Sequence, residues 1–296
     1  MDSDHKHKVI AKEKDIRINE YLIGVFPSLP SRKSIKKALK RKKIYVDGRL
    51  ADSALWINLG MEIELIKEST LERKIYPIEL EVVFEDEHLA VVNKPAGLVS
   101  SGNQFRTLQN AISGHIKLSK QIDAIDPPLL VHRLDSATSG LVIIAKTASS
   151  AKKLGEMLAT HEIMKKYSAL LIGKIDEEGK IKSSIDNKTA ISEYKRVKQI
   201  PSEAFESLSW VELYPLSGRT HQLRIHMADN NTPILGDRIH GKHKLDIKGK
   251  GLFLSAIGLE FTHPISQEKI TIEIPEPKKF NKYWEWTLKR NFLNQT

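Results

Sequence analysis

One aspartate stands where a folded chain could present a reactive carboxylate. It is Asp135, within residues 131–146, which read VHRLDSATSGLVIIAK. Gly140 permits a tight bend after this polar turn, and the apolar run 141–145 carries branched side chains that favour a buried strand. The pattern therefore predicts a carboxylate held at the lip of a strand, on rigid support. The ordinary alternative is an aspartate that only hydrogen-bonds its own turn.

Three further motifs accompany this one in a fixed order. They read VFEDEHLAVVNKPAGLVSS before it, KKYSALLIG after it, and then LSGRTHQLRIHM with PILGDRIHG. Together they resemble the RluA family of RNA pseudouridine synthases, over most of the chain from about Leu80 onward. A kinase interpretation of HRLD fails, because the sequence has no D-F-G and no glycine-rich loop before it. The resemblance implies that Asp135 is the catalytic residue.

A buried carboxylate needs a cation beside it, because burial disfavours the charged form. The resemblance supplies that cation as Arg224 of HQLR, and it supplies Tyr167 of KKYSALL as the ring that stacks on the target base. By residue type alone, Arg219 could replace Arg224, and Tyr167 could be an ordinary strand aromatic. The family motif favours Arg224, so we expect Arg219 nearby as a phosphate or loop contact.

The reaction that the resemblance implies breaks the ribose C1′–N1 bond of a uridine and joins C1′ to C5 of the same base. Nothing is oxidised or hydrolysed, so we expect neither a cofactor nor a metal. The carboxylate could attack C1′ or abstract a sugar proton, and both routes stay open. A base inside folded RNA must first be flipped out. We expect Arg133 to enter the resulting gap or hold the displaced strand, because its guanidinium can stack on bases and bind phosphate.

Two patterns that suggest other chemistry are incomplete. Residues 236–243, GDRIHGKH, nearly form a phosphate loop of the type GxxxxGK[ST], but the last position is His243. The chain has 11 histidines, yet His221 and His226 lie five residues apart, which matches neither a helix face nor a strand face. The sequence therefore predicts neither ATP binding nor a metal site.

A strongly basic segment lies near the N-terminus. Residues 31–43, SRKSIKKALKRKK, contain eight basic residues and no acid. Ile35, Ala38 and Leu39 recur at helical spacing, so we predict a helix that docks by this stripe, with Ser31 or Ser34 as its N-cap. Its outward residues are candidates for RNA binding, and a solvated basic face is the alternative. These candidates are Arg32, Lys33, Lys36, Lys37 and Lys40.

The surroundings of this helix resemble an S4 RNA-binding domain. IRINEYLIGVFP precedes it, and KKIYVDGRLADSALWINLGMEIELI follows it with a hairpin turn at Asp47-Gly48. We therefore predict an S4-like domain over residues 1–67, a linker over 68–79 and a pseudouridine synthase domain over 80–296. Lysines on a helix suit phosphate contacts, which supply affinity and little sequence information.

Composition limits the partners. The formal net charge is +10, which favours an anionic partner, and RNA fits better than DNA or a membrane surface given the motifs. There is no cysteine, no apolar run near the ~20 residues of a membrane span, and no signal-peptide pattern, so a cytoplasmic monomer is expected. Ribosomal RNA of the large subunit is the preferred target and transfer RNA the variant. The alternative function is a non-catalytic RNA-binding or ribosome assembly protein.

The predicted fold class is α+β, with a mixed, mainly antiparallel central sheet. We expect helices at 107–116, 149–160 and 280–292, and a chain break at Pro127 and Pro128. Strands are expected at 80–84, 89–92, 167–172, 191–197, 208–214, 252–257 and 269–274. Residues 101–112 and 177–188 diverge from the family and are expected to be RNA-contacting loops. Ser255 replaces a histidine that is usual in the family.

Overall fold

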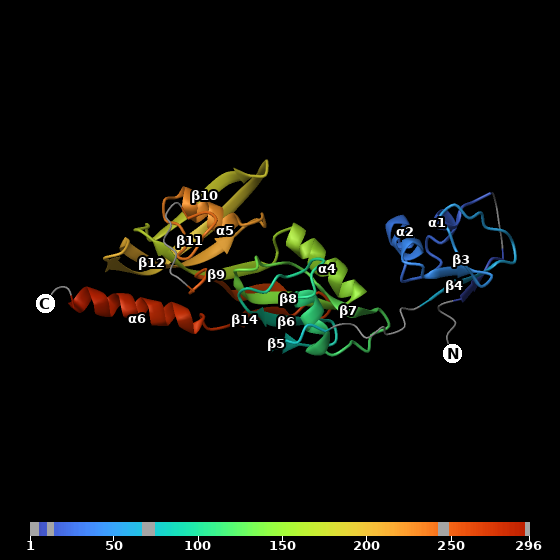
Figure 1. Cartoon of the computed structure of the whole chain (residues 1–296), viewed down its shortest axis with the longest axis horizontal. Helices are drawn as coiled ribbons and strands as arrows, with labels where there is room; N and C mark the ends of the chain where they lie inside the picture. The colour runs from blue at the N-terminus through green and yellow to red at the C-terminus, as the bar shows by residue number, and fades with distance from the viewer. Residues whose placement is uncertain (1–5, 11–14, 67–74, 242–248, 294–296) are drawn as a thin grey trace. The chain divides into compact units, whose positions relative to one another are not determined.

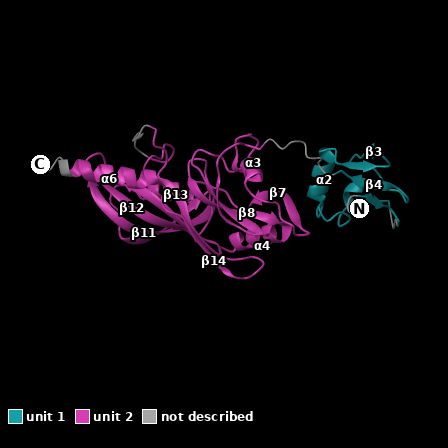
Figure 2. Ribbon diagram, turned by 90° about the horizontal axis from the view of Figure 1, so that it is seen from below, with its two compact units in different colours: residues 1–73 teal, residues 74–296 magenta. Residues whose placement is uncertain are grey.

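The chain divides into two compact units, residues 1–73 and residues 74–296 (Figure 2). The computed structural model describes residues 6–10, 15–66, 75–241 and 249–293. Residues 67–74, which include 68–74 of the expected linker, lie outside these ranges. Within the described ranges, no helix combines the length and the apolar character that crossing a bilayer requires.

The first unit is a small antiparallel sheet with two helices. Its strand order is β1-β4-β2-β3. Asp47 and Gly48 both have positive φ, 48° and 74°, as the tight turn between β2 and β3 requires, so the predicted hairpin is confirmed. The elements are β1 (Lys6–Lys8), α1 (Ile18–Tyr21), α2 (Arg32–Lys40), β2 (Ile44–Val46), β3 (Arg49–Leu50) and β4 (Glu62–Leu65).

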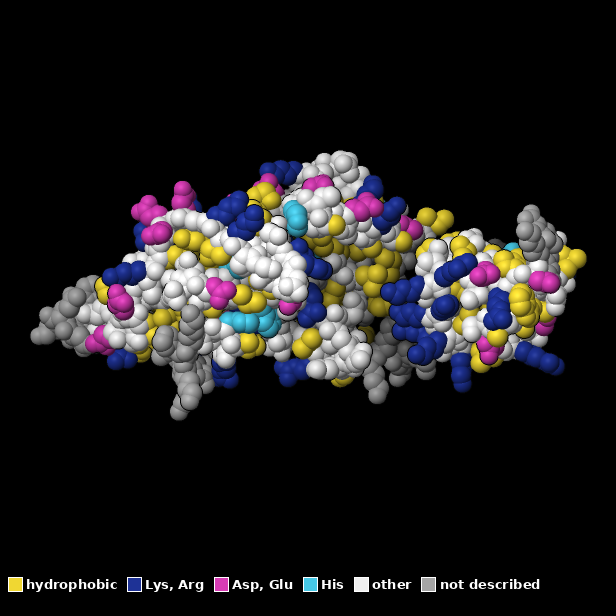
Figure 3. Space-filling view, turned by 90° about the horizontal axis from the view of Figure 1, so that it is seen from above, with side chains coloured by type: hydrophobic (Ala, Val, Ile, Leu, Met, Phe, Trp, Pro, Cys, Tyr) yellow, Lys and Arg dark blue, Asp and Glu magenta, His cyan; other side chains and the backbone are white. Residues whose placement is uncertain are grey.

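The basic helix α2 forms as predicted. Ser31 caps it, with its Oγ accepting a hydrogen bond from the Ser34 amide at 3.2 Å. Ile35, Ala38 and Leu39 are buried against the core of this unit. The five basic candidates on the helix are exposed, and Figure 3 shows lysine and arginine side chains gathered on the surface of this unit. The apolar stripe therefore docks the helix and leaves its charges in solvent.

The second unit is built on a ten-stranded sheet of order β10-β11-β12-β9-β13-β8-β6-β5, with β14 paired to β13 and β7 to β8 (Figure 1). Among the described strands, β13 and β8 form the one parallel pair. The predicted mixed, mainly antiparallel sheet is thus confirmed. The strands are β5 (Glu81–Glu85), β6 (Leu89–Lys94), β7 (Ala124–Leu130), β8 (Ser139–Thr147), β9 (Met164–Ile172), β10 (Glu178–Ile185), β11 (Lys188–Ser202), β12 (Glu206–Pro215), β13 (Leu254–Thr262) and β14 (Lys269–Glu273).

Helices cover both faces of this sheet. On β9, alternate residues point to opposite sides, so Tyr167 belongs to one core and Leu170 to another. Leu223 of α5 packs in the first core and Phe280 of α6 in the second. The helices are α3 (Leu108–Ala111), which continues as a 3₁₀ turn over Ile112–Gly114, α4 (Ala148–Ala159), α5 (Gln222–Asp229) and α6 (Lys278–Leu293).

The structure corrects three predictions. Residues 177–188 are not a loop, because 178–185 form β10, whose alternating residues Ile181 and Ile185 face inward. Pro127 and Pro128 do not end an element, because they lie inside β7 at a register irregularity where the strand lacks partners on β8. The helix predicted over 107–116 is short: α3 spans Leu108–Ala111, with Thr107 as its cap.

Gly140 serves a different purpose from the predicted bend. It is the second residue of β8 and pairs with Ala256 of β13 in the parallel ladder. Its φ is 115°, and a Cβ there would lie 2.1 Å from the carbonyl oxygen of Ala256. Only glycine therefore allows β13 to approach the start of β8, and this approach supports the loop that carries Asp135.

Candidate active site

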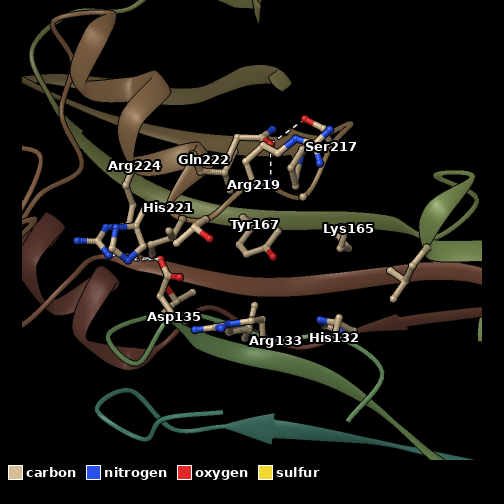
Figure 4. A pocket seen from close by; sticks show the side chains of 18 of the residues that line it. His132, Arg133, Asp135, Lys165, Tyr167, Ser217, Arg219, His221, Gln222 and Arg224 are labelled. Carbon is tan, nitrogen blue, oxygen red and sulfur yellow. Dashed lines mark hydrogen bonds and ion pairs between the residues drawn. The ribbon is translucent and has the colours of Figure 1, made fainter. Parts of the chain in front are cut away.

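A pocket of about 290 Å³ opens over the loop between β7 and β8. Asp135 lies in this loop, and its side chain is 18% exposed. The lining also includes Tyr167 from β9 and Arg224 from α5, so three segments that are distant in the sequence meet here (Figure 4). All three residues that the sequence assigns to catalysis thus line one pocket; the roles themselves stay predictions.

Arg224 connects two carboxylates. Its Nη1 donates to Oδ2 of Asp135 at 3.3 Å. Its Nε and Nη2 donate to Asp237 at 2.8 and 2.7 Å, in the two-pronged geometry that suits a planar guanidinium. Burial alone would raise the pKa of Asp237, but the hydrogen bonds from Arg224 and from the amides of His240 and Ile239 lower it. Asp237 therefore holds Arg224 in place as a fixed cation for Asp135.

Tyr167 forms the inner wall of the pocket and is 9% exposed. Burial, and then the charge of Asp135, raise the pKa of its hydroxyl, so the phenol stays neutral. Lys165, two residues earlier on β9, lies on the same side of the strand and also lines the pocket, where it is half-buried. An aromatic ring and an ammonium thus share one wall, as nucleotide binding would require.

The other predicted residues of this unit also reach the pocket. Arg133 is exposed at its rim, and Arg219 lines it while donating from Nε to the carbonyl of Thr189 at 3.3 Å. His132 has a structural contact, because its Nε2 accepts the amide of Ile143 at 3.1 Å. Burial, and then the nearby charge of Lys165, lower the pKa of His132 to about 3. The basic candidates of α2 belong to the first unit, and the residues that line this pocket belong to the second.

Sequence reasoning missed Lys94, a buried cation behind the loop that carries Asp135. The side chain is fully buried, and its Nζ donates to the carbonyls of Leu98, Pro95 and Ser136 at 2.8, 3.0 and 3.3 Å. Ser136 follows Asp135 directly, so Lys94 fastens the loop from below. Burial lowers the pKa of Lys94 to about 8, and the charge of Asp135 opposes the shift. A lysine followed by proline at the end of an apolar strand is recognisable in the sequence, but no neighbouring residue indicates that this lysine lies near Asp135.

Lys94 predicts a loss of activity at alkaline pH that unfolding does not explain. Above about pH 8 the ammonium loses its proton, and the loop loses a donor and Asp135 a nearby positive charge. Stability should instead rise from about pH 8 to 10.5, because there the unfolded chain binds the proton more tightly than the folded one. We expect single-turnover rates to fall severalfold over this range in the wild type and to stay low but level in Lys94→Met. If the rate of Lys94→Met still fell with rising pH as in the wild type, the fall would belong to a group other than Lys94.

Comparison with known protein families and with curated relatives identifies the class of enzyme to which this pocket and fold belong. The family model "RNA pseudouridylate synthase" matches residues 88–229. The "Uncharacterized RNA pseudouridine synthase" of Aquifex aeolicus is 32% identical, covering 91% of this chain and 93% of that protein. The chain is therefore an RNA pseudouridine synthase, an isomerase that acts on RNA. Within this class it belongs to the RluA-type family.

Two named relatives and one solved structure agree with this placement. The "Ribosomal large subunit pseudouridine synthase C" of Rickettsia bellii is 31% identical, over 90% of this chain and 96% of its own. The "Ribosomal large subunit pseudouridine synthase D" of Pseudomonas aeruginosa is 30% identical, over 89% of each. The solved structure of "Human RNA Pseudouridylate Synthase Domain Containing 1" has a TM-score of 0.56 at 23% identity, covering 69% of this chain and 87% of that chain, and shares the fold.

Proposed function

We propose that this enzyme isomerises specific uridines of large-subunit ribosomal RNA to pseudouridine, with Asp135 as the catalytic residue and without a cofactor. One observation carries the proposal: the Asp135 carboxylate lies 3.3 Å from the buried Arg224 guanidinium in a pocket that Tyr167 also lines. This carboxylate has a guanidinium beside it and still faces space for a ribose. The proposed substrate places the reaction in the cytoplasm, with a monomer as the acting species.

The proposed reaction begins with a flipped uridine whose base stacks on Tyr167. Asp135 then either bonds to C1′ or removes a sugar proton, and the C1′–N1 bond breaks. The base turns and C5 bonds to C1′, which releases the carboxylate from C1′ or, on the other route, is followed by return of the sugar proton. C5 then loses its proton, and N1 gains one. Arg224 places a positive charge beside the Asp135 carboxylate, and Arg133 at the rim holds the RNA that the flip disturbs. Arg219 and Lys165 are proposed to contact phosphate.

The choice of ribosomal RNA follows from the printed names of the Rickettsia and Pseudomonas relatives. Transfer RNA is the alternative substrate for the same chemistry. A non-catalytic RNA-binding or ribosome assembly role is a function of another class. The juxtaposition of Asp135, Tyr167 and Arg224 in one pocket favours catalysis over it, because binding an anionic RNA does not require a carboxylate in the binding surface.

Mapping the pseudouridines of cellular RNA tests the proposal. Cells that lack their own copy would express the wild-type chain or Asp135→Asn, and carbodiimide-based sequencing would map pseudouridine in all RNA. We expect sites in large-subunit ribosomal RNA that appear with the wild type and not with the variant. Sites confined to transfer RNA would change the substrate, and sites equally restored by Asp135→Asn would overturn the catalytic assignment.

We further propose that residues 1–67 are an S4-like domain that supplies RNA affinity, followed by a linker over 68–79 and the catalytic domain over 80–296. The exposed basic residues of α2 support this, because a rigid helix that presents five cations fits a phosphate backbone. Arg32 also forms an ion pair with Glu20 at 3.1 Å, which leaves the four lysines as the proposed contacts.

Neutralising those four lysines is expected to weaken the binding of all RNA sequences by about the same factor. In the full-length chain carrying Lys33→Gln, Lys36→Gln, Lys37→Gln and Lys40→Gln, the slope of log K against log salt should flatten by up to about 3, since each lost phosphate contact removes roughly 0.7 to 0.9. Titrations of labelled RNA at several salt concentrations measure this. Deleting residues 1–67 should have at least the same effect, and unchanged binding by both variants would contradict the assignment.

A further inference from the structure

The proposed reaction does not use two histidines near its centre: His221 lies beside Asp135, and His240 lies behind His221. His221 Nε2 lies 3.7 Å from Oδ2 of Asp135, and on its other side His221 Nδ1 lies 2.9 Å from Nε2 of His240. The two rings meet edge to face, with their centroids 5.1 Å apart. Figure 4 shows His221 next to Arg224 at the end of the pocket that holds Asp135. The three groups therefore form a chain from Asp135 through His221 to His240.

The backbone holds His221 in an unfavourable conformation to achieve this. His221 precedes α5 with φ 56° and ψ 17°, in the left-handed region that residues with a Cβ rarely adopt. Such residues persist where the surrounding structure requires them, often at functional sites. Gln222 supplies that requirement, because its Oε1 accepts from Ser217 Oγ at 2.7 Å and its Nε2 donates to the carbonyl of Ile191 at 2.9 Å.

Only one proton fits between the two imidazoles while both are neutral, so the pair has two arrangements. In one, His221 donates from Nδ1 and turns the lone pair of Nε2 toward the Asp135 carboxylate, which repels it. In the other, His240 donates from Nε2 and His221 presents an N–H to the carboxylate. Electrostatics favours the second arrangement. Proton uptake by His221 would then have to occur at Nδ1, which His240 already occupies.

We propose that His240 is a positioning residue that fixes the tautomer of His221, so that a neutral N–H and not an imidazolium faces Asp135. The inference rests on the proposed function, in which Asp135 reacts. A second full cation beside Asp135, added to Arg224, would stabilise the carboxylate before the reaction more than during it, because the reaction consumes its charge. The pair therefore keeps Asp135 reactive as the pH falls.

The charges around the pair are consistent with a neutral His240. Asp237, Arg224 and Asp135 face it from the loop after α5, from α5 and from the loop before β8. Burial lowers the pKa of His240, Asp237 opposes that shift, and Arg224 adds to it. Asp135 and His240 are the titratable groups within ion-pair or hydrogen-bond distance of His221 in the described part of the chain.

Rates as a function of pH test the proposal. Single-turnover release of tritium from [5-³H]uridine RNA would be measured for the wild type, His240→Phe and His240→Gln. In His240→Phe nothing occupies Nδ1, so a new acid limb should appear in the pH profile, with a loss of rate of about three- to tenfold at its low-pH end. His240→Gln keeps an amide donor and should keep the shape of the wild-type profile.

The double variant His221→Asn/His240→Phe provides the decisive control. Asparagine tolerates the left-handed conformation and has no imidazole, so the new acid limb should vanish. A limb that persists in the double variant, or one equally present in His240→Gln, would overturn the proposal. A merely structural loss in His240→Phe would lower the rate at every pH alike, and that outcome would overturn it too.

Long-range ¹H–¹⁵N spectra of the full-length protein test the tautomer without any RNA. With His221 assigned by comparison with His221→Asn, we expect a proton on Nε2 alone in the wild type and, in His240→Phe at low pH, a second proton on Nδ1. A wild-type proton on Nδ1 would sink the inference. This measurement does not depend on turnover, so it separates failure of the tautomer argument from failure of the proposed function.

Discussion

Replacing Asp135 with asparagine is expected to abolish pseudouridine formation, with a rate loss of about 10⁴-fold or more. The amide has nearly the same shape as the carboxylate, but it can neither bond to C1′ nor accept a sugar proton at a useful rate. Arg224 keeps its two hydrogen bonds to Asp237, so the pocket should stay assembled. Tritium release from [5-³H]uridine RNA under single-turnover conditions measures the loss.

Binding distinguishes this result from misfolding. Asp135→Asn removes a negative charge near the bound RNA, so its affinity for RNA should equal or exceed that of the wild type. The midpoint of its urea unfolding should stay close to the wild-type midpoint. Glu285→Gln makes the same chemical change at an exposed residue of α6 and should leave both rate and affinity unaltered. A rate within tenfold of the wild type in Asp135→Asn would remove this residue from catalysis.

Replacing Arg224 with methionine is expected to cost both activity and stability. Asp237, whose side chain is 1% exposed, would lose both charge-assisted hydrogen bonds and remain buried without a countercharge. Breaking such a pair costs about 3–5 kcal/mol of unfolding free energy. Asp135 would lose its fixed cation as well, so the remaining folded protein should be inactive. Urea denaturation and tritium release measure the two losses.

A double variant separates these effects. Arg224→Met/Asp237→Asn removes the stranded charge, so we expect it to recover about half of the lost stability and none of the activity. Arg224→Lys keeps a charge but cannot contact both oxygens of Asp237 and reach Asp135, so it should be intermediate in both measurements. Wild-type stability in Arg224→Met would show that the buried pair contributes nothing net to folding.

Much of the local structure could be predicted because its causes are local. The apolar stripe of Ile35, Ala38 and Leu39 predicts the buried side of α2, and Asp47-Gly48 predicts the turn between β2 and β3. The motif order led to a mixed, mainly antiparallel sheet, which the structure confirms. It also led to Asp135, and the loop position at the start of β8 agrees with the predicted lip of a strand.

The errors arose where a distant partner decides the outcome. Residues 177–188 were predicted to be a loop because they diverge from the family pattern, yet pairing with β11 makes residues 178–185 a strand. Pro127 and Pro128 are tolerated in β7 because the strand lacks partners on β8 at that point. The sequence predicts a bend at Gly140, but glycine is required there because the backbone of Ala256 leaves no room for a side chain.

From the order of residues alone one obtains a reaction class, a reactive carboxylate and the side chains that accompany it in related enzymes. Folding adds their physical state. Arg224 and Asp135 are separated by 89 positions yet lie 3.3 Å apart, Lys94 supports the loop from beneath, and His240 reaches Asp135 through His221. Charge, burial and proton position depend on neighbours in space, and no short stretch of chain contains those neighbours.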